Sequence, residues 1–221
     1  DILNNMPGRI LPLVNDEVYH IFNRGNDKRN IFLLQGDYRR FIKTFYYYQF
    51  EGPKPKLSDL SKNRFTNFKP TQSSKLIEIL AYCLMPNHFH LLVKQLKTNG
   101  ISIFMSQLAN SYTKYFNRKF KRVGSLLQGT FKSVIVKTDG QLIHVSRYIH
   151  INPVVAGIVS KPQYHQWSSY LEYANGSSGY CSTDLILNLF SSRKEYCKFT
   201  EDQIDYGKSL EAIKHQLLED D

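Results

Sequence analysis

Two histidines stand one residue apart near the middle of the chain. The stretch is AYCLMPNHFHLLVK, residues 81–94, in which Phe89 separates His88 from His90. Successive side chains of a β-strand point to opposite faces, so a strand here places both imidazoles on one face and Phe89 on the other. Imidazole binds zinc, manganese, nickel and cobalt. Two hydrogen-bonded histidines without a metal would give the same pattern, so a metal site needs further ligands.

A second stretch, LIHVSRYIHINPVVAGIV at residues 142–159, offers such groups. On a helix, His144, Tyr148 and Asn152 follow at intervals of four residues and share a face, whereas His150 faces elsewhere. A phenol beside a divalent cation can act as a nucleophile, because the cation polarises a phosphodiester and offsets charge in the transition state. Asn152 adds a carbonyl oxygen. The alternative is that Tyr148 only packs at the edge of the core and that Asn152 and Pro153 only end the helix.

The elements that must position these residues can be predicted from pattern. Residues 18–24, 76–85, 88–95 and 131–138 are rich in β-branched and aromatic residues and predict four strands. Pro86 and Asn87 form a turn between the second and third strands, which predicts an antiparallel hairpin.

Three helices are predicted between and after these strands. Asp37 caps a helix that runs to about Phe50, Asn99 and Gly100 open a long helix, and Asp139 caps a helix over residues 140–151 that Pro153 stops. The resulting order is β-α-β-β-α-β followed by a helix. It predicts an α+β, ferredoxin-like split βαβ fold, in which a four-stranded antiparallel sheet carries helices on one face.

The remaining segments predict the organisation of the chain. Residues 52–75 hold three prolines and six Lys or Arg against one Asp, which indicates a polar basic loop that is either solvated or in contact with DNA. ANGSSG at 174–179 is typical of a linker. We therefore expect one domain over residues 1–173, and a linker with a short helical C-terminal extension over residues 174–221.

Composition narrows the class of partner. The 221 residues carry a net charge of +10, and 14% of them are aromatic, a combination that favours nucleic acid, because Lys and Arg neutralise phosphates and rings stack on unpaired bases. Three scattered cysteines without a CxxC pair fit a reducing cytoplasm. The chain has no run of 18 apolar residues, so its sequence predicts no membrane span. We expect a cytoplasmic, nucleoid-associated protein that has no membrane partner.

Five stretches, in order, resemble the single-tyrosine HUH transposases, and among these the REP-associated tyrosine transposases. They are VYHIFNRGNDKRNIF, AYCLMPNHFHLLVK, FNRKFKRVGSLLQGTFKSVIV, SRYIHINPVVAGIV and YHQWSSY. The family's His-hydrophobic-His motif is met by His88, Phe89 and His90. The resemblance runs from about Met6 to Tyr170, interrupted by the loop at 52–75.

The resemblance implies roles for named residues. His88 and His90 would hold a divalent cation, Mg²⁺ or Mn²⁺, with Asn152 as the third ligand. Tyr148 would be the nucleophile that cleaves single-stranded or hairpin DNA through a 5′-phosphotyrosine intermediate and then transfers the strand. No small-molecule cofactor is implied. Relatives include both monomers and domain-swapped dimers, so a monomer and a homodimer both remain open.

Other residues are candidates for DNA contact. Asn23, Arg24 and Asn26 surround Gly25 at the end of the first strand, where the alternative is a turn in which Gly25 supplies an unusual φ. The end of the long helix carries cations that either contact the DNA backbone or are solvated: Lys114, Arg118, Lys121 and Arg122. Thr130 and Val155 stand where the family commonly has arginine, and each removes a potential phosphate contact.

Two other classes of function remain open at this point. A catalytically silent protein that binds DNA hairpins would keep the same fold. A ferredoxin-like RNA-binding module would use the histidines for structure alone. The presence of His88, His90 and Tyr148 together favours the DNA-cleaving and strand-joining enzyme over both alternatives.

Overall fold

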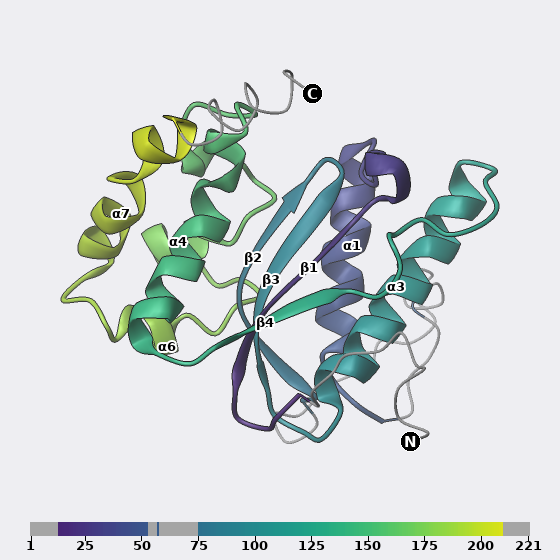
Figure 1. Cartoon of the computed structure of the whole chain (residues 1–221), viewed down its shortest axis with the longest axis horizontal. Helices are drawn as coiled ribbons and strands as arrows, with labels where there is room; N and C mark the ends of the chain where they lie inside the picture. The colour runs from purple at the N-terminus through teal and green to yellow at the C-terminus, as the bar shows by residue number, and fades with distance from the viewer. Residues whose placement is uncertain (1–12, 53–56, 58–74, 210–221) are drawn as a thin grey trace, which may run out of the picture.

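The computed structural model describes residues 13–52, 57 and 75–209 (Figure 1). Most of the predicted basic loop at 52–75 lies outside the described residues, and so does the end of the predicted C-terminal extension. No helix within the described ranges has the length and apolar character needed to cross a bilayer.

The four predicted strands form one antiparallel sheet. They are β1 (Val18–Arg24), β2 (Ile77–Met85), β3 (His88–Gln95) and β4 (Lys132–Val136), in the spatial order β2-β3-β1-β4. β2 and β3 form the predicted hairpin, and β1 pairs with both β3 and β4. The predicted α+β fold class, with its split βαβ order, is confirmed.

Two helices cover one face of this sheet. α1 (Gln35–Tyr48) and α3 (Gly100–Lys119) pack on each other and on the core that contains Phe89, Leu91 and Val93. Asp37 does serve the start of α1, but from inside the first turn. Its carboxylate accepts the backbone N–H groups of Leu33 and Leu34, which have no partner within the helix.

The opposite face of the sheet is also covered, which differs from the predicted arrangement with helices on one face. α4 (Asp139–Val155), α5 (Tyr170–Asn175), α6 (Asp184–Leu187) and α7 (Arg193–Glu201) lie on that side (Figure 1). The reason is visible in β2, where every residue except Glu78 is buried. A strand that is apolar on both faces needs a layer on each side.

The bounds of α4 correct two details of the prediction. Thr138, not Asp139, caps the helix, because its hydroxyl accepts the N–H of Gln141 at 3.1 Å. The helix also continues through Pro153 to Val155. A proline this close to the end removes one hydrogen bond from the last turn, and that turn closes through the N–H of Ala156, which donates to the carbonyl of Asn152.

The outer edge of β2 is hydrogen-bonded by segments from the end of the chain. The N–H of Leu84 donates to the carbonyl of Trp167, and the N–H groups of Ser169 and Ser182 donate to carbonyls of β2. α7 packs against α4 and α5, and Arg193 of α7 donates to two carbonyls of α5. The residues after the predicted linker therefore belong to the layer over α4.

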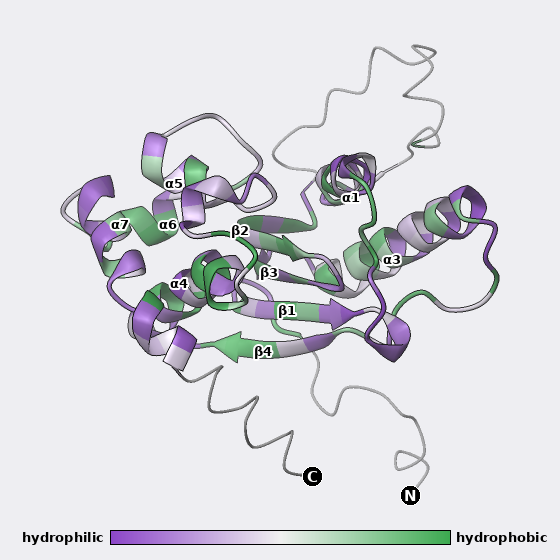
Figure 2. Cartoon of the chain, turned by 90° about the horizontal axis from the view of Figure 1, so that it is seen from above, coloured by the Kyte–Doolittle hydropathy of each residue, from purple (hydrophilic) through white to green (hydrophobic). Residues whose placement is uncertain are grey.

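Three strands have polar residues at the same edge of the sheet, where β1 ends at Arg24, β3 begins at His88 and β4 begins at Lys132. In Figure 2 the end of β1 is hydrophilic and lies beside β4, whereas the middle of the sheet is apolar. The segment before β4 lies at the same edge, because the N–H of Gln128 donates to the carbonyl of Arg24 at 2.8 Å. This end of the sheet, on the side of α4, holds the candidate site.

Candidate active site

His88 and His90 lie on the face of β3 that is turned toward α4. Phe89 points the other way, into the core, where its ring centroid is 4.9 Å from that of Phe41 on α1. The β1 residues directly opposite the two histidines are Arg24 and Phe22. Directly opposed residues share a face, so these side chains belong to the same surface as the imidazoles. The predicted orientation of the two histidines is therefore the observed one.

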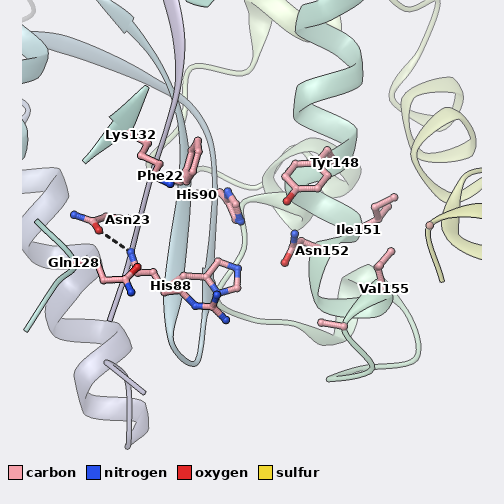
Figure 3. A pocket seen from close by; sticks show the side chains of 13 residues that line it. Phe22, Asn23, His88, His90, Gln128, Lys132, Tyr148, Ile151, Asn152 and Val155 are labelled. Carbon is pink, nitrogen blue, oxygen red and sulfur yellow. Dashed lines mark hydrogen bonds between the residues drawn. The ribbon is translucent and has the colours of Figure 1, made fainter. Parts of the chain in front are cut away.

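α4 brings Tyr148 and Asn152 to this surface (Figure 3). The ring centroids of Tyr148 and His90 are 5.4 Å apart with the rings nearly perpendicular, and Asn152 is hydrogen-bonded to His88. Tyr148 is 48% exposed, so a substrate can reach its phenol. His144, predicted on the same helix face, instead bonds to Arg147 and packs against Phe199 of α7.

These side chains line a pocket of about 630 Å³. Its walls come from β1, β3, β4, α4, the segment before β4 and the segment after α7. The lining residues are Phe22, Asn23, Arg24, His88, His90, Gln128, Lys132, Tyr148, Ile151, Asn152, Val155, Ala156 and Gly207. Arg24 and Lys132 are cationic, and none of the described residues that line the pocket is acidic. The pocket therefore suits an anionic ligand.

Burial keeps the imidazoles of the pocket uncharged near neutral pH. Burial and, to a smaller extent, the charge of Arg24 lower the pKa of His88 to about 4, although the hydrogen bond to Asn152 opposes the shift. Burial, with the nearby His20 and His88, holds the pKa of His90 well below its ordinary value. A neutral imidazole has a lone pair on one nitrogen, which is the form that binds a metal.

Hydrogen bonds decide which nitrogen of His88 has the lone pair. Its Nδ1 is 2.6 Å from Oδ1 of Asn87, and the amide nitrogen of Asn87 donates to the carbonyl of Lys28. Asn87 therefore presents its oxygen, which can only accept, so Nδ1 of His88 carries the proton. Nε2 of His88 is left with the lone pair.

His90 has a buried nitrogen without a partner. Its Nδ1 is 2.9 Å from Nε2 of His20, and its Nε2 is buried with no hydrogen-bond partner among the described residues. Buried polar atoms in native proteins nearly always have a partner. A cation at this point would supply one, so the residues present fit a bound metal. Among the described residues no three His, Cys, Asp or Glu side chains form a cluster suited to a metal, and the amide of Asn152 lies in the same pocket as the two imidazoles.

The predicted DNA contacts of the NRGN stretch differ in position. Arg24 is exposed at the pocket, and Asn23 lines it, but the amide of Asn23 is held by Gly129 and by the N–H of Arg24. Asn26 does not line the pocket and bonds to Asp27. Gly25 has an ordinary φ of −61°, which corrects the reading of an unusual turn. A Cβ at Gly25 would lie 2.2 Å from the carbonyl oxygen of Arg29, so close packing explains the glycine.

The predicted cations of α3 are not brought to the pocket. α3 lies on the opposite side of the sheet from α4 (Figure 1). Lys114, Arg118 and Lys121 are exposed there. Arg122 donates to Asn117 and lies over the ring of Phe116, so it takes part in local packing. Val155 lines the pocket, whereas Thr130 does not.

Several site residues are absent from the sequence-based prediction: His20, Phe22, Asn87, Gln128 and Lys132. A signal existed for two of them. His20, Phe22 and Arg24 alternate along β1 and must share a face, by the same rule that was applied to His88 and His90. Gln128 and Lys132 reach the pocket through the pairing of their segments with β1, for which the local sequence has no signal.

Residues 57–152 match the family model described as "Transposase IS200 like". The fold is similar to a solved structure of the REP-associated tyrosine transposase bound to a REP hairpin, with a TM-score of 0.53 and 17% identity, covering 85% of this chain and 96% of that one.

A second solved structure, from Deinococcus radiodurans R1 and described as a transposase, is 17% identical and has a TM-score of 0.29, covering 65% of this chain and 95% of that one. No curated protein matches the chain in sequence.

Proposed function

We infer, from the premise that this chain belongs to the IS200-like transposase family, that it cleaves single-stranded DNA and joins the cut strand to another end. The observation that carries the proposal is the meeting of Tyr148 on α4 with His88 and His90 on β3 in one pocket. Neither a silent hairpin-binding protein nor an RNA-binding module needs a reachable phenol beside two uncharged imidazoles.

The chemistry falls to Tyr148. Its phenol oxygen attacks the scissile phosphorus, the bond from phosphorus to the 3′ oxygen breaks, and the proton lost by the phenol is matched by one gained at the 3′ oxygen. The products are a 5′-phosphotyrosine and a free 3′-hydroxyl. A 3′-hydroxyl of the same or another strand then attacks the phosphotyrosine, forms a new phosphodiester and releases Tyr148. The step needs no ATP, because the covalent intermediate keeps the phosphodiester energy.

A divalent cation, Mg²⁺ or Mn²⁺, would be held by Nε2 of His88, Nε2 of His90 and the amide oxygen of Asn152. When bound, it would polarise the scissile phosphate and offset the charge that develops on its oxygens. The chain's own part is to keep both imidazoles neutral by burial, and to fix the Nδ1 proton of His88 through Asn87.

DNA would approach along the cationic wall of the pocket. Arg24 at the end of β1 and Lys132 at the start of β4 offer charges to phosphates on either side of the scissile one. Phe22 lies on β1 directly opposite Lys132, lines the pocket and offers a ring to a base. We propose that the substrate is a single strand beside a hairpin, such as the hairpin bound by the structurally similar transposase.

One chain is enough to build the pocket. Tyr148 and both histidines come from the same chain and line the same cavity. We therefore propose that Tyr148 acts within its own chain, whether the protein is a monomer or a homodimer. We also propose that residues 1–173 carry the reaction and that residues 174–221 form an extension. The proposed place of action is the nucleoid in the cytoplasm.

The test is a covalent trapping experiment. Single-stranded hairpin oligonucleotides labelled at the 5′ or the 3′ end are incubated with Mn²⁺ or Mg²⁺ and wild-type protein, Tyr148→Phe or Tyr164→Phe. Tyr164 is 63% exposed and does not line the pocket, so its variant is the matched control. We expect adducts to the 3′-labelled fragment with wild type and Tyr164→Phe, and none with Tyr148→Phe.

Two outcomes would contradict the proposal at different levels. If wild-type protein forms no adduct with any member of a broad oligonucleotide library but still binds hairpins, the silent hairpin-binding function replaces the enzyme. If Tyr148→Phe still cleaves, the reaction stands but Tyr148 is not its nucleophile.

A further inference from the structure

We infer that His20 is a positioning residue, which accepts a hydrogen bond from Nδ1 of His90 and thereby keeps the lone pair of His90 on Nε2, facing the pocket. The inference rests on the proposed function of His90 as a metal ligand and deepens it. His20 does not line the pocket, so it acts through His90 and not on the substrate.

The sheet places the two rings together. His90 lies directly opposite Phe22, and His20 is the next residue along β1 on the same face, opposite Leu92. Nε2 of His20 is 2.9 Å from Nδ1 of His90. The ring centroids are 5.1 Å apart with 27° between the planes. The contact joins two neighbouring strands in the middle of the sheet, so its geometry is fixed by backbone pairing.

One proton is shared between these two nitrogens, and it can belong to either ring. If His20 donates, then Nδ1 of neutral His90 has the lone pair and its Nε2 carries a hydrogen. That N–H would be buried without an acceptor, because Nε2 of His90 has no partner among the described residues. An unsatisfied buried donor destabilises the arrangement that contains it.

The opposite arrangement leaves no buried donor unsatisfied. If Nδ1 of His90 donates to His20, then Nε2 of His90 has a lone pair, and a bound cation satisfies it. Metal-binding histidines usually donate their second nitrogen to a carboxylate, carbonyl or water, which sets the tautomer and the ring orientation. Asn87 accepts the hydrogen bond from Nδ1 of His88 through its side-chain carbonyl oxygen. His20 accepts the corresponding hydrogen bond from His90 through an imidazole nitrogen.

An imidazole nitrogen accepts a hydrogen bond in only one of its two neutral tautomers, whereas a carbonyl oxygen always accepts. Nε2 of His20 accepts only when His20 carries its proton on Nδ1. A glutamine at position 20 would offer a carbonyl oxygen at a similar distance from the backbone, whereas leucine would offer none. The pair of variants His20→Gln and His20→Leu therefore separates the hydrogen bond from the volume of the side chain.

The first measurement needs no variant. In metal-free, full-length protein with ¹⁵N-labelled histidine, the nitrogen pattern of His90 by NMR distinguishes the two neutral tautomers. Assignment uses the loss of the signal in His90→Gln. We expect the proton on Nδ1. A proton on Nε2 of His90 in the wild type overturns the inference, whatever the variants do.

The second measurement is Mn²⁺ affinity by calorimetry without DNA, which does not depend on cleavage. Loss of a residue that orients a metal ligand typically weakens metal binding about 10- to 100-fold. We expect His20→Leu to fall in that range and His20→Gln to remain within about threefold of the wild type on the same scale. His144→Gln, at an exposed histidine outside the pocket, is the matched control and should not change.

The outcomes for the two proposals are distinct. Wild-type affinity in His20→Leu overturns the role of His20, while loss of affinity in His90→Ala leaves the metal site standing. If Mn²⁺ binds wild type and His90→Ala equally, the proposed metal site fails, and the NMR tautomer still decides whether His20 orients His90. If His20→Leu does not fold, His20→Gln and the NMR pattern of the wild type decide the question.

Discussion

Arg24 and Lys132 are the cationic side chains among the described residues that line the pocket, and they lie on two neighbouring strands. A phosphate contact releases counterions from DNA, and each contact with a single strand contributes about −0.7 to the slope of log affinity against log salt. We expect Arg24→Ala and Lys132→Ala each to flatten that slope by about 0.7, as measured by fluorescence anisotropy over a salt series.

Lys114→Ala is the control for this experiment. Lys114 is exposed on α3, across the sheet from the pocket. An unchanged slope in Lys114→Ala places the DNA path on the α4 side. The reverse pattern, with Lys114 changing the slope and Arg24 not, would move the path to α3, as the cations of that helix suggest from sequence.

Asn152 forms one hydrogen bond through its side chain and one through its backbone carbonyl, and a substitution removes only the first. Its side chain bonds to His88, and its carbonyl accepts the N–H that closes the helix. We expect Asn152→Ala to weaken Mn²⁺ binding about tenfold, or 1.4 kcal/mol, since an oxygen ligand is lost while alanine keeps the helix. Asn152→Asp should restore affinity through a charged oxygen. Calorimetry shows whether both variants instead bind like the wild type, in which case Asn152 is not a ligand of the cation.

At the scale of elements, α4 is anchored by a buried polar network on the side away from the pocket. Nδ1 of His150 is 2.6 Å from the hydroxyl of Tyr196 on α7, and Nε2 is 2.8 Å from the hydroxyl of Ser169. Tyr196 donates in turn to Ser146 of α4. The network joins the helix that carries Tyr148 to α7 and, through the bonds of Ser169 with Tyr82, to β2.

The network should make the stability of the protein sensitive to acid. Burial lowers the pKa of His150 from 6.5 to about 3, so the folded protein holds the ring neutral while the unfolded chain protonates it near pH 6.5. The contribution to stability is complete above that value and decreases as the pH falls. We expect the wild type to lose about 2 kcal/mol more than His150→Gln between pH 7.5 and pH 5, measured by urea unfolding. Equal losses would show that other groups cause the acid sensitivity.

For the whole molecule, the position of Tyr148 beside the histidines of its own chain has a functional consequence. We expect that Tyr148→Phe and His90→Ala proteins, each unable to form an adduct alone, remain inactive when mixed in equal amounts, because neither chain contains a complete pocket. Adduct formation on the labelled hairpin is the measurement. Recovery of adducts in the mixture would show that two chains exchange α4 and that the site is shared between them.

The extent to which sequence predicts this molecule depends on the range of the interactions involved. Alternation along β3 is a local property, and it placed His88 and His90 on one face correctly. The bond between His20 and His90 joins residues 70 positions apart and depends on the register of β1 against β3. The position of the α3 cations depends on which side of the sheet each helix packs, which their charge pattern does not indicate.

Burial on both sides of β2 had a local signal that the sequence-based prediction did not use. IEILAYCLM is apolar at successive positions, where a strand with one wet face would alternate. The buried face of α4 is harder to predict from sequence. Its buried residues include Ser146 and His150 beside Ile149 and Ile151, and they do not form one apolar stripe. The four-residue spacing predicts that Tyr148 and Asn152 share a face, but which face of α4 meets the sheet follows from its packing against β2, β3 and α7.

The hydrogen bonds along the outer edge of β2 protect the protein against aggregation through that edge. An unpaired strand edge is a template for strands of other molecules, and proteins protect such edges. β4 is short, and Lys132 and Lys137 flank its exposed stretch. β2 is long and apolar, and its outer groups are occupied by Trp167, Ser169 and Ser182. The segments that follow α4 thus protect this edge from pairing with other molecules, and a chain that ended at residue 173 would lose the hydrogen bond that Ser182 makes to it.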